Sequence, residues 1–503
     1  MCSKQTLVSA LVATALCAAV EGLNVPKRQS TTEAISLPTI NTTQGYLQGS
    51  LSNFRSPYVT SYKGIPYAAA PVGDLRWRAP QAAAAWDGVL NATEFGPQCL
   101  QEYSSAGIFS SGKTSMSEDC LTLNIWTPTY EDTTELTSKN LPVYFWIFGG
   151  RFEGGSGDVK TYDGSGLASK GVIVVTINYR LGSFGYLAHP DLQAEDEHNS
   201  TGNYGIMDQQ LALQWVHDNI ANFGGNPDQV VVGGQSAGSS SALDVMYSPL
   251  TTGLAQGIIA ESGARGPHDP MTGGLATSYR NLTWALSHGE SFLATSLNVS
   301  TIAEARNISA ETLVTFGNDM DTSMDGSVFV AASAAFSDPP LWRPTIDGYV
   351  LAYKYGEALR SGKHLDVPVM TGNNKDESGA APDTNLTVEE YTSQMSSVMQ
   401  NFSSQYFSLW PAGENSTTAS AAFNEFFRDL SRVSTWTWVQ DWVAGGASSD
   451  VYTYFWTRTP AENSDSGAYH GSELWYTFNN IRKYLSQEQT LLYLFIIIFL
   501  AFF

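Results

Sequence analysis

A serine flanked by glycines is the first feature of this sequence whose residue types could do chemistry. Gly234-Gln-Ser-Ala-Gly238 fits the pattern Gly-x-Ser-x-Gly, in which a serine stands on a sharp turn between a strand and a helix. The glycines permit close backbone approach, and the helix that follows directs its N–H groups toward developing negative charge. The alternative is a chance match in a chain that contains 45 glycines. A preceding apolar run, Val230–Val232, and a helix-compatible segment after the turn, Ser240–Tyr247, favour a nucleophile at Ser236.

A serine nucleophile needs a base, and the base needs an acid that orients it. In proteins that carry the nucleophile on this type of turn, the three residues follow one another along the chain in the order serine, acid, histidine. The chain has seven histidines, and order alone leaves three after the nucleophile that could still follow an acid at some distance. Glu377 narrows the choice, because it follows a predicted strand, Pro368–Thr371, and only His470 lies beyond it. The alternative for His470 is a surface histidine in the turn-like segment Gly467–Ser472.

A third requirement is a set of N–H groups that binds the oxyanion of a tetrahedral intermediate. The loop Gly149-Gly-Arg-Phe152 follows a predicted strand that ends at Ile147. Backbone N–H groups of this loop and of Ala237 could serve. The alternative is an ordinary tight turn.

The elements around these residues alternate between apolar strands and helical patterns. This order predicts an α/β fold with a mostly parallel sheet. Weak periodicity and many turn residues between Arg265 and Ser337 predict a helical cap over the edge of the sheet. The predicted strands are Pro142–Ile147, Val172–Ile177, Gln229–Val232, Pro368–Met370 and Val451–Trp456, and the predicted helix is Met207–Phe223.

Composition excludes some partners. The net charge is −22 and the pI is about 4.6, so phosphate backbones and anionic membranes would be repelled. Hydrophobic residues make up 43% of the chain and charged residues only 15%. No repeat and no long low-complexity linker divides the chain, which favours one catalytic domain over residues 29–480.

The N-terminus predicts secretion. Lys4, the apolar run Leu7–Val20 and small residues near position 22 form a signal-peptide pattern over residues 1–22. The pair Lys27-Arg28 is either a processing site, which makes residues 23–28 a short propeptide, or a chance basic pair. Cys99 and Cys120 remain after cleavage, and in an oxidising compartment they are expected to pair. Nine Asn-x-Ser/Thr triplets predict several glycosylation sites: Asn41, Asn91, Asn199, Asn281, Asn298, Asn307, Asn385, Asn401 and Asn415.

Together these motifs resemble the type-B carboxylesterase/lipase family, which includes cholinesterases and fungal extracellular lipases, and they suggest a secreted fungal member. The resemblance runs from about Gln44 to about Phe478 and rests on several blocks besides the serine turn. They are Gly64-Ile-Pro-Tyr67 with Pro71, Arg76 and Pro80; Glu118–Trp126; Asn178–Gly182 with Phe184-Gly185; Gly202–Gly205 with Asp208-Gln209 and Trp215; Asn219-Ile220; Phe223–Gly225; Asp347-Gly348; and His470-Gly-Ser-Glu473.

The resemblance implies an α/β-hydrolase fold, a mostly parallel sheet flanked by helices with a helical cap insertion. It implies a catalytic triad of Ser236, Glu377 and His470, and ester hydrolysis through an acyl-enzyme. No metal and no organic cofactor is expected. It further implies an oxyanion hole at Gly150, Arg151 and Ala237, a Cys99–Cys120 disulfide, and ion pairs Arg76–Glu118 and Arg180–Asp208.

Three features depart from the family pattern. Gln235 replaces the usual glutamate before the nucleophile, and we expect a modest effect. Arg151 replaces a small residue. A residue with a side chain resists a positive φ at this position, and the long cationic side chain is expected to lie beside the acyl site. Residues 481–503 end in an apolar stretch, Leu491–Phe503. This stretch is shorter than a membrane span. We interpret it as a truncated or mispredicted terminus, with a GPI signal as the alternative.

The substrate is the least determined prediction. The segment between Cys99 and Cys120 contains Tyr103, Ile108 and Phe109 but no tryptophan, which argues against a cholinesterase-like cation site. Its short length favours an esterase over a lipase with a large lid. The expected partner is a small-molecule or lipid ester; no nucleic acid and no stable membrane span is expected, and the oligomeric state is open. Alternatives are a non-catalytic binding protein, and a lipase, amidase or thioesterase with the same triad.

Overall fold

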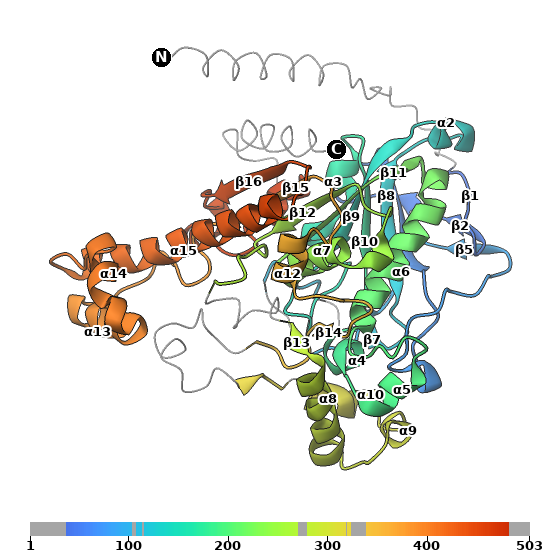
Figure 1. The fold of residues 1–503 in the computed structure, drawn as a ribbon. Coiled ribbons are helices and arrows are strands. Elements are labelled where there is room, and N and C mark those ends of the chain that lie inside the picture. The colour runs from blue at the N-terminus through green and yellow to red at the C-terminus, as the bar shows by residue number, and fades with distance from the viewer. Residues whose placement is uncertain are drawn as a thin grey trace.

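A mixed sheet forms the centre of the molecule (Figure 1). The computed structural model describes residues 37–102, 107–112, 115–269, 279–317, 319–322 and 339–481. Within these residues the sheet has nine strands, in the spatial order β16-β15-β12-β11-β9-β10-β8-β4-β3. Neighbouring strands are parallel from β16 to β10, and β8, β4 and β3 continue the sheet antiparallel. In that order the strands span Val451–Trp456, Val369–Asn374, Gly257–Glu261, Gly225–Gln235, Leu141–Ile147, Ile173–Ile177, Thr122–Pro128, Val59–Pro66 and Ser50–Leu51.

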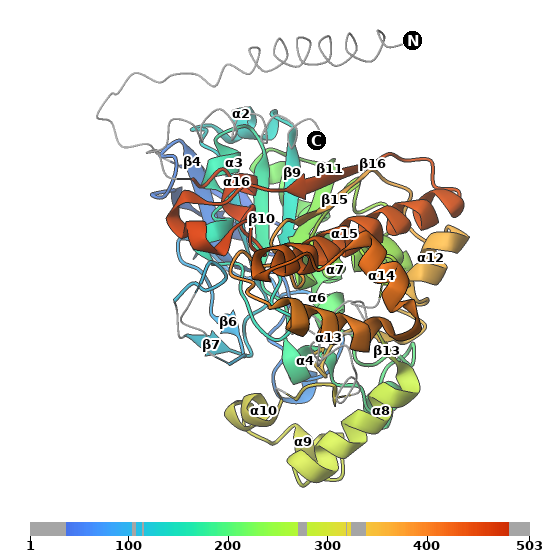
Figure 2. The ribbon, with the colours of Figure 1, turned by 90° about the vertical axis from the view of Figure 1, so that its left-hand side faces the viewer.

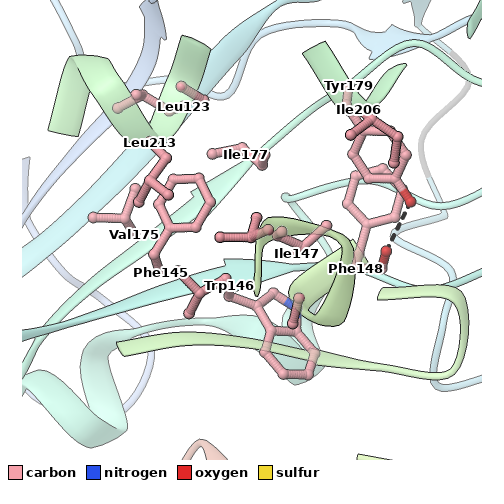
Figure 3. Close-up of a cluster of buried hydrophobic side chains, with 14 of the residues drawn as sticks. Leu123, Phe145, Trp146, Ile147, Phe148, Val175, Ile177, Tyr179, Ile206 and Leu213 are labelled. Carbon is pink, nitrogen blue, oxygen red and sulfur yellow. Dashed lines mark hydrogen bonds between the residues drawn. The ribbon is translucent and has the colours of Figure 1, made fainter. Parts of the chain in front are cut away.

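The middle strands are buried on both faces, as expected of parallel strands covered by helices. All five residues of β10 are buried, as are the last five of β9. Figure 3 shows their side chains packed with Ile206 and Leu213 of α6 (Tyr204–Asn219). The Tyr179 hydroxyl donates to the Phe148 carbonyl over 2.8 Å, which ties the two chain segments that leave β10 and β9. The predicted strands are confirmed, and the predicted helix corresponds to α6 followed by a 3-10 turn, Ile220–Phe223.

Helices flank the sheet (Figure 2). Helix α7 (Ala237–Tyr247) packs against β11, β12 and β9, while α3 (Ser165–Ala168) packs against β8, β10 and β4. Helix α12 (Tyr355–Ser361) packs against α15 (Ser416–Ala444). The other helices of the main body are α2 (Thr133–Thr137), α4 (Gly182–Tyr186), α5 (Pro190–Glu195) and α16 (Leu474–Thr477). Short strands outside the sheet are Ile40–Asn41, Tyr46–Gln48, Val89–Asn91, Gln98–Cys99, Met116–Ser117, Arg280–Asn281 and Thr345–Ile346.

The described part of the predicted cap contains three helices besides the short strand Arg280–Asn281. It contains α8 (Leu282–Ser291), continued by a π-helical turn to Ser296, then α9 (Ile302–Ala305) and α10 (Ala310–Phe316). Helix α10 packs against α4 of the main body. Residues 270–278, 318 and 323–337 of the predicted cap lie outside the described residues, as do the predicted leader and propeptide and residues 482–503 of the predicted tail.

A second group of helices projects from the main body (Figure 1) and was not predicted. We call it the helical extension: α13 (Val388–Met399), α14 (Ser403–Leu409) and the first half of α15, to Leu430. Capping boxes begin α13 at Thr387 and α15 at Asn415. The extension has its own buried cluster, separate from the main core, made of Ala380, Tyr391, Met395, Tyr406, Ala419, Phe423, Phe426 and Phe427.

Candidate active site

Ser236 occupies a strained turn between β11 and α7. Its φ is 59° and its ψ is −124°, a conformation that costs a residue with a side chain of order 1–3 kcal/mol. The neighbouring glycines are required by contact: a Cβ on Gly234 would lie 2.1 Å from the Gly238 carbonyl oxygen, and one on Gly238 would lie 2.1 Å from the Ile147 oxygen. The Ser236 N–H donates to the Glu261 carbonyl over 2.9 Å. The turn is thus held by β9 and β12, the strands on either side of β11.

Glu377 and His470 meet although 93 residues separate them. His470 Nδ1 lies 2.6 Å from Glu377 Oε2, and the glutamate's Oε1 accepts the Asn374 N–H over 2.8 Å. The two loops are joined beside this pair, since Asp376 N–H donates to the Ala468 carbonyl and Ala468 N–H donates to an Asp376 carboxylate oxygen. The predicted acid and base are therefore brought into direct contact by backbone pairing of their loops.

The pKa shifts of Glu377 and His470 are those expected of a carboxylate that is hydrogen-bonded to a basic imidazole. Burial raises the pKa of Glu377, but its hydrogen bond to His470 and the charge of that ring outweigh burial, so the pKa lies below its usual range. Burial lowers the pKa of His470, but the same hydrogen bond and the charge of Glu377 raise it above its usual value. The Glu377 side chain is 1% exposed, whereas the His470 side chain is 43% exposed. The imidazole thus has a fixed inner edge and an outer edge that a substrate can reach.

The outer nitrogen of His470 contacts Gln235, which the sequence analysis did not assign to the site. His470 Nε2 lies 3.1 Å from Gln235 Nε2. Among the described residues, no hydrogen bond joins Ser236 to His470. The position of Gln235 directly before the nucleophile was the one available signal, because a strand-to-helix turn brings both residues to the same edge of the sheet.

The predicted oxyanion loop packs onto the nucleophile turn. A Cβ on Gly149 would lie 2.3 Å from the Gln235 carbonyl oxygen and 3.0 Å from Ser236 Cβ. Gly150, Arg151 and Phe152 have positive φ values of 120°, 60° and 64°. Ala237 is the first residue of α7, and the first N–H groups of a helix have no partner within it. The loop and the helix start are thus adjacent, while the role of their N–H groups in binding an oxyanion stays a prediction.

Arg151 adopts the backbone conformation that glycine favours, with φ near 60°. Its side chain is 42% exposed, and its Nε lies 3.7 Å from Glu153 Oε2. Burial raises the pKa of Glu153 to about 7, against the opposing charge of Arg151. Near pH 7 the glutamate therefore only partly neutralises the guanidinium.

Two further carboxyl groups are buried behind the histidine loop. Burial and the neighbouring Glu473 raise the pKa of Glu261 well above its usual value, and burial followed by the charge of Glu377 raises that of Glu473 to about 7. Thr477 Oγ1 contacts Glu261 over 3.3 Å, and the Asn374 amide donates to Glu473. These acids are thus held mainly protonated below pH 7.

The structural pairs implied by the resemblance are present. Cys99 and Cys120 form a disulfide with an S–S length of 2.04 Å. Arg76 Nε donates to Glu118 over 2.7 Å, and Arg180 Nη2 donates to Asp208 over 2.7 Å. Ile108 and Phe109 of the disulfide-closed loop lie against the histidine loop, since a Cβ on Gly471 would be 2.4 Å from the Phe109 ring. In the described part of the chain, no cluster of three His, Cys, Asp or Glu side chains is arranged to hold a metal ion.

Comparison with known proteins gives the family. The model of the carboxylesterase family matches residues 36–502. The chain belongs to the carboxylesterase family. It is 34% identical over 427 residues to a fumonisin B1 esterase of Sphingopyxis macrogoltabida, covering 84% of this chain and 72% of that protein. It is 35% identical to the para-nitrobenzyl esterase of Bacillus subtilis (strain 168), over 67% of this chain and 62% of the relative. With the cholinesterase of Mus musculus the identity is 34%, over 68% of this chain and 54% of the relative, so the chain spans less than two thirds of these last two proteins.

Solved structures of esterases resemble this chain in fold. A para-nitrobenzyl esterase matches with a TM-score of 0.69 and 28% identity, over 91% of this chain and 88% of its own. A carboxylesterase of Geobacillus stearothermophilus matches with a TM-score of 0.68 and 30% identity, over 90% and 88% of the two chains. The protein thus has the α/β-hydrolase fold of these esterases and is a carboxylesterase.

Proposed function

We propose that this carboxylesterase is a secreted hydrolase of carboxylic esters that acts through Ser236, His470 and Glu377. The observation that carries the proposal is the 2.6 Å contact between His470 Nδ1 and the buried Glu377. The same ring contacts Gln235, the residue before Ser236 in a turn whose glycines admit no side chain. A carboxylate that holds Nδ1–H leaves Nε2 as the acceptor for a hydroxyl proton.

The reaction begins when His470 Nε2 turns from Gln235 toward Ser236. It takes the hydroxyl proton as Ser236 Oγ attacks the ester carbonyl, and Glu377 stabilises the imidazolium that forms. The imidazolium then protonates the alcohol oxygen as the C–O bond breaks. Water, deprotonated by the same nitrogen, releases the carboxylic acid and regenerates the serine. N–H groups of Gly150, Arg151 and Ala237 bind the oxyanion in both steps.

The walls of the site suggest which esters it accepts. Phe109 lies with its ring centroid 6.4 Å from that of His470, which gives the base an apolar neighbour. Arg151 supplies a cation from the predicted oxyanion loop, whose Gly149 packs against the nucleophile turn. We expect small to medium uncharged esters to be hydrolysed, with Arg151 restricting or charging the acyl pocket.

Secretion is part of the proposal. All nine sequon asparagines belong to described residues, and all nine are exposed, although exposure alone leaves their occupancy open. The Cys99–Cys120 disulfide also suits an oxidising compartment. Mass spectrometry of protein secreted from a eukaryotic host, before and after enzymatic deglycosylation, tests glycosylation directly.

A hydrolysis screen tests the function. Uncharged p-nitrophenyl esters of increasing acyl length should be hydrolysed by the full chain and not by its Ser236→Ala variant. Ser240→Ala is the matched control, since Ser240 lies one turn further along α7. Absence of hydrolysis of every ester by the folded protein would favour the alternative, a binding protein of the same fold.

A further inference from the structure

The partner of the catalytic base in the structure is an amide. His470 Nδ1 faces Glu377, so a neutral ring carries its proton there and presents a lone pair at Nε2. Gln235 Nε2 lies 3.1 Å from that lone pair and can donate to it. The Gln235 amide thus donates a hydrogen bond to the uncharged imidazole. It provides no acceptor for the imidazolium, whose Nε2–H would face another donor.

The other end of this amide is buried. Gln235 is 1% exposed, and its Oε1 is buried without a hydrogen-bond partner among the described residues. A buried carbonyl oxygen without a partner is costly. The amide therefore keeps an acceptor unused inside the protein while its NH₂ group engages the base.

Ionisable and apolar groups also lie around His470. Glu377 and Glu473 raise the pKa of the ring, and Arg265, which follows β12, lowers it. Phe109 contributes an apolar ring from the disulfide-closed loop. Gln235, at the end of β11, is thus an uncharged polar group in a set that otherwise favours the imidazolium on balance.

We propose that Gln235 is a positioning residue that holds His470 uncharged with Nε2 turned away from Ser236, so that substrate binding must release the imidazole before it acts as base. This inference rests on the proposed function, because it assigns a partner to the base of that reaction. Its consequence is an enzyme whose base stays neutral, and hence ready, at lower pH than the surrounding carboxylates would allow.

Two substitutions test the proposal through the pH dependence of kcat/KM. Gln235→Glu places a carboxylate on Nε2, which stabilises the imidazolium. The midpoint of the acid limb should rise by about one to three pH units. Gln235→Met keeps the length of the side chain but removes the donor, and the midpoint should rise by less, roughly half to one unit. Gln210→Met is the control: Gln210 is a buried glutamine of α6 that donates to Ser248, and the midpoint should not move.

The direction in which Gln235→Met shifts the midpoint shows whether the amide donates to His470 Nε2 or accepts from it. If the amide instead presents its oxygen to an Nε2–H, removing it would lower the midpoint, and that result would overturn the proposal. So would a Gln235→Glu midpoint within about 0.3 unit of the wild type, a margin well below the shift of one unit or more expected from a contacting charge.

A measurement on the resting protein separates this inference from the function itself. Titration of the His470 ring by proton NMR, through its low-field Nδ1–H resonance, should show the same order of midpoints: wild type lowest, Gln235→Met next, Gln235→Glu highest. If the protein hydrolyses no ester, the proposed function fails while this order still tests Gln235. If it hydrolyses esters and the order is absent, the proposal for Gln235 fails alone.

Discussion

Around Ser236 the backbone has almost no free space, whereas the helical extension is held by side chains. In the first region a Cβ on Gly234 or Gly238 would lie within 2.1 Å of a carbonyl oxygen. In the second, aromatic rings pack edge to face, as Phe423 does with Phe427 at 4.9 Å between centroids. Close packing of the main chain therefore positions Ser236, whereas burial of side chains stabilises the helical extension.

The two regions meet at the acid loop. Arg428 of α15 forms a 2.7 Å ion pair with Asp376, the residue before Glu377. Phe427 packs on the same loop, since a Cβ on Gly379 would lie 2.6 Å from its ring. The extension thus contacts the loop that carries Glu377, the proposed catalytic acid. Substitutions on each side of this contact can test how far the two regions depend on each other.

The largest expected effect is at the acid itself. Glu377→Gln should lower kcat about 10⁴-fold, because an amide neither fixes the Nδ1–H tautomer nor stabilises the imidazolium. Thermal stability should change far less than activity. Steady-state kinetics with an uncharged ester and a melting curve measure both. Glu389→Gln, on the exposed start of α13, should change neither, and a loss of activity there would mean that the assay reports folding.

The next prediction compares two substitutions in the helical extension, of which only one should affect the candidate active site. Phe423→Ala and Phe427→Ala each remove a buried ring of the same helix and should each lower the stability of the extension by about 3–5 kcal/mol. Only Phe427→Ala should also reduce kcat/KM, several-fold, because the Phe427 ring packs directly on Gly379 of the loop that carries Glu377. Denaturant unfolding and kinetics measure the two effects. Equal losses of activity in both variants would show that the regions are not separable.

A smaller effect concerns pH and stability. The pKa of Glu473 is raised by burial to about 7 in the folded protein, against about 4.3 in an unfolded chain. The folded state therefore holds this proton more tightly. Its stabilising effect is complete below about pH 4 and is lost as pH rises through 7, by about 4 kcal/mol in total.

Glu473→Gln should consequently flatten the decline of the melting temperature between pH 5 and 8. Glu357→Gln, an exposed residue at the start of α12, should leave the decline unchanged. A wild-type melting temperature that rises over this range would contradict the assignment of a protonated Glu473.

The smallest effect is expected in the oxyanion loop. Arg151→Gly relieves a positive φ and removes the cation, while its N–H remains. The rate on short esters should change less than the roughly 10²–10³-fold cost of losing an oxyanion donor, but the relative kcat/KM of short and long acyl chains should change. An unchanged chain-length profile would exclude Arg151 from the pocket wall.

The sequence predicted the elements whose patterns are local. Apolar runs located β9, β10, β15 and β16, and the glycine spacing located the turn at Ser236. Order along the chain then selected Glu377 and His470, which the structure brings together. The strands and the turn were predictable because strand burial and tight turns restrict the residue types directly, whereas the catalytic roles of the three residues stay a prediction.

The features that the sequence did not predict depend on contacts between distant segments. The pairing of Asp376 with Ala468 and the contact of Gln235 with His470 join residues far apart in the chain. The helical extension was missed because its apolar residues cover a small separate cluster rather than the sheet. No periodicity within one segment indicates which other segment it contacts.

The most direct test of the account is covalent labelling of the nucleophile. The full chain is treated with a fluorophosphonate, digested, and mapped by tandem mass spectrometry, with Ser236→Ala and Ser240→Ala in parallel. The account predicts one adduct, on Ser236, formed in the wild type and in Ser240→Ala and absent from Ser236→Ala. An adduct on another serine, or none on folded protein that hydrolyses esters, would contradict it.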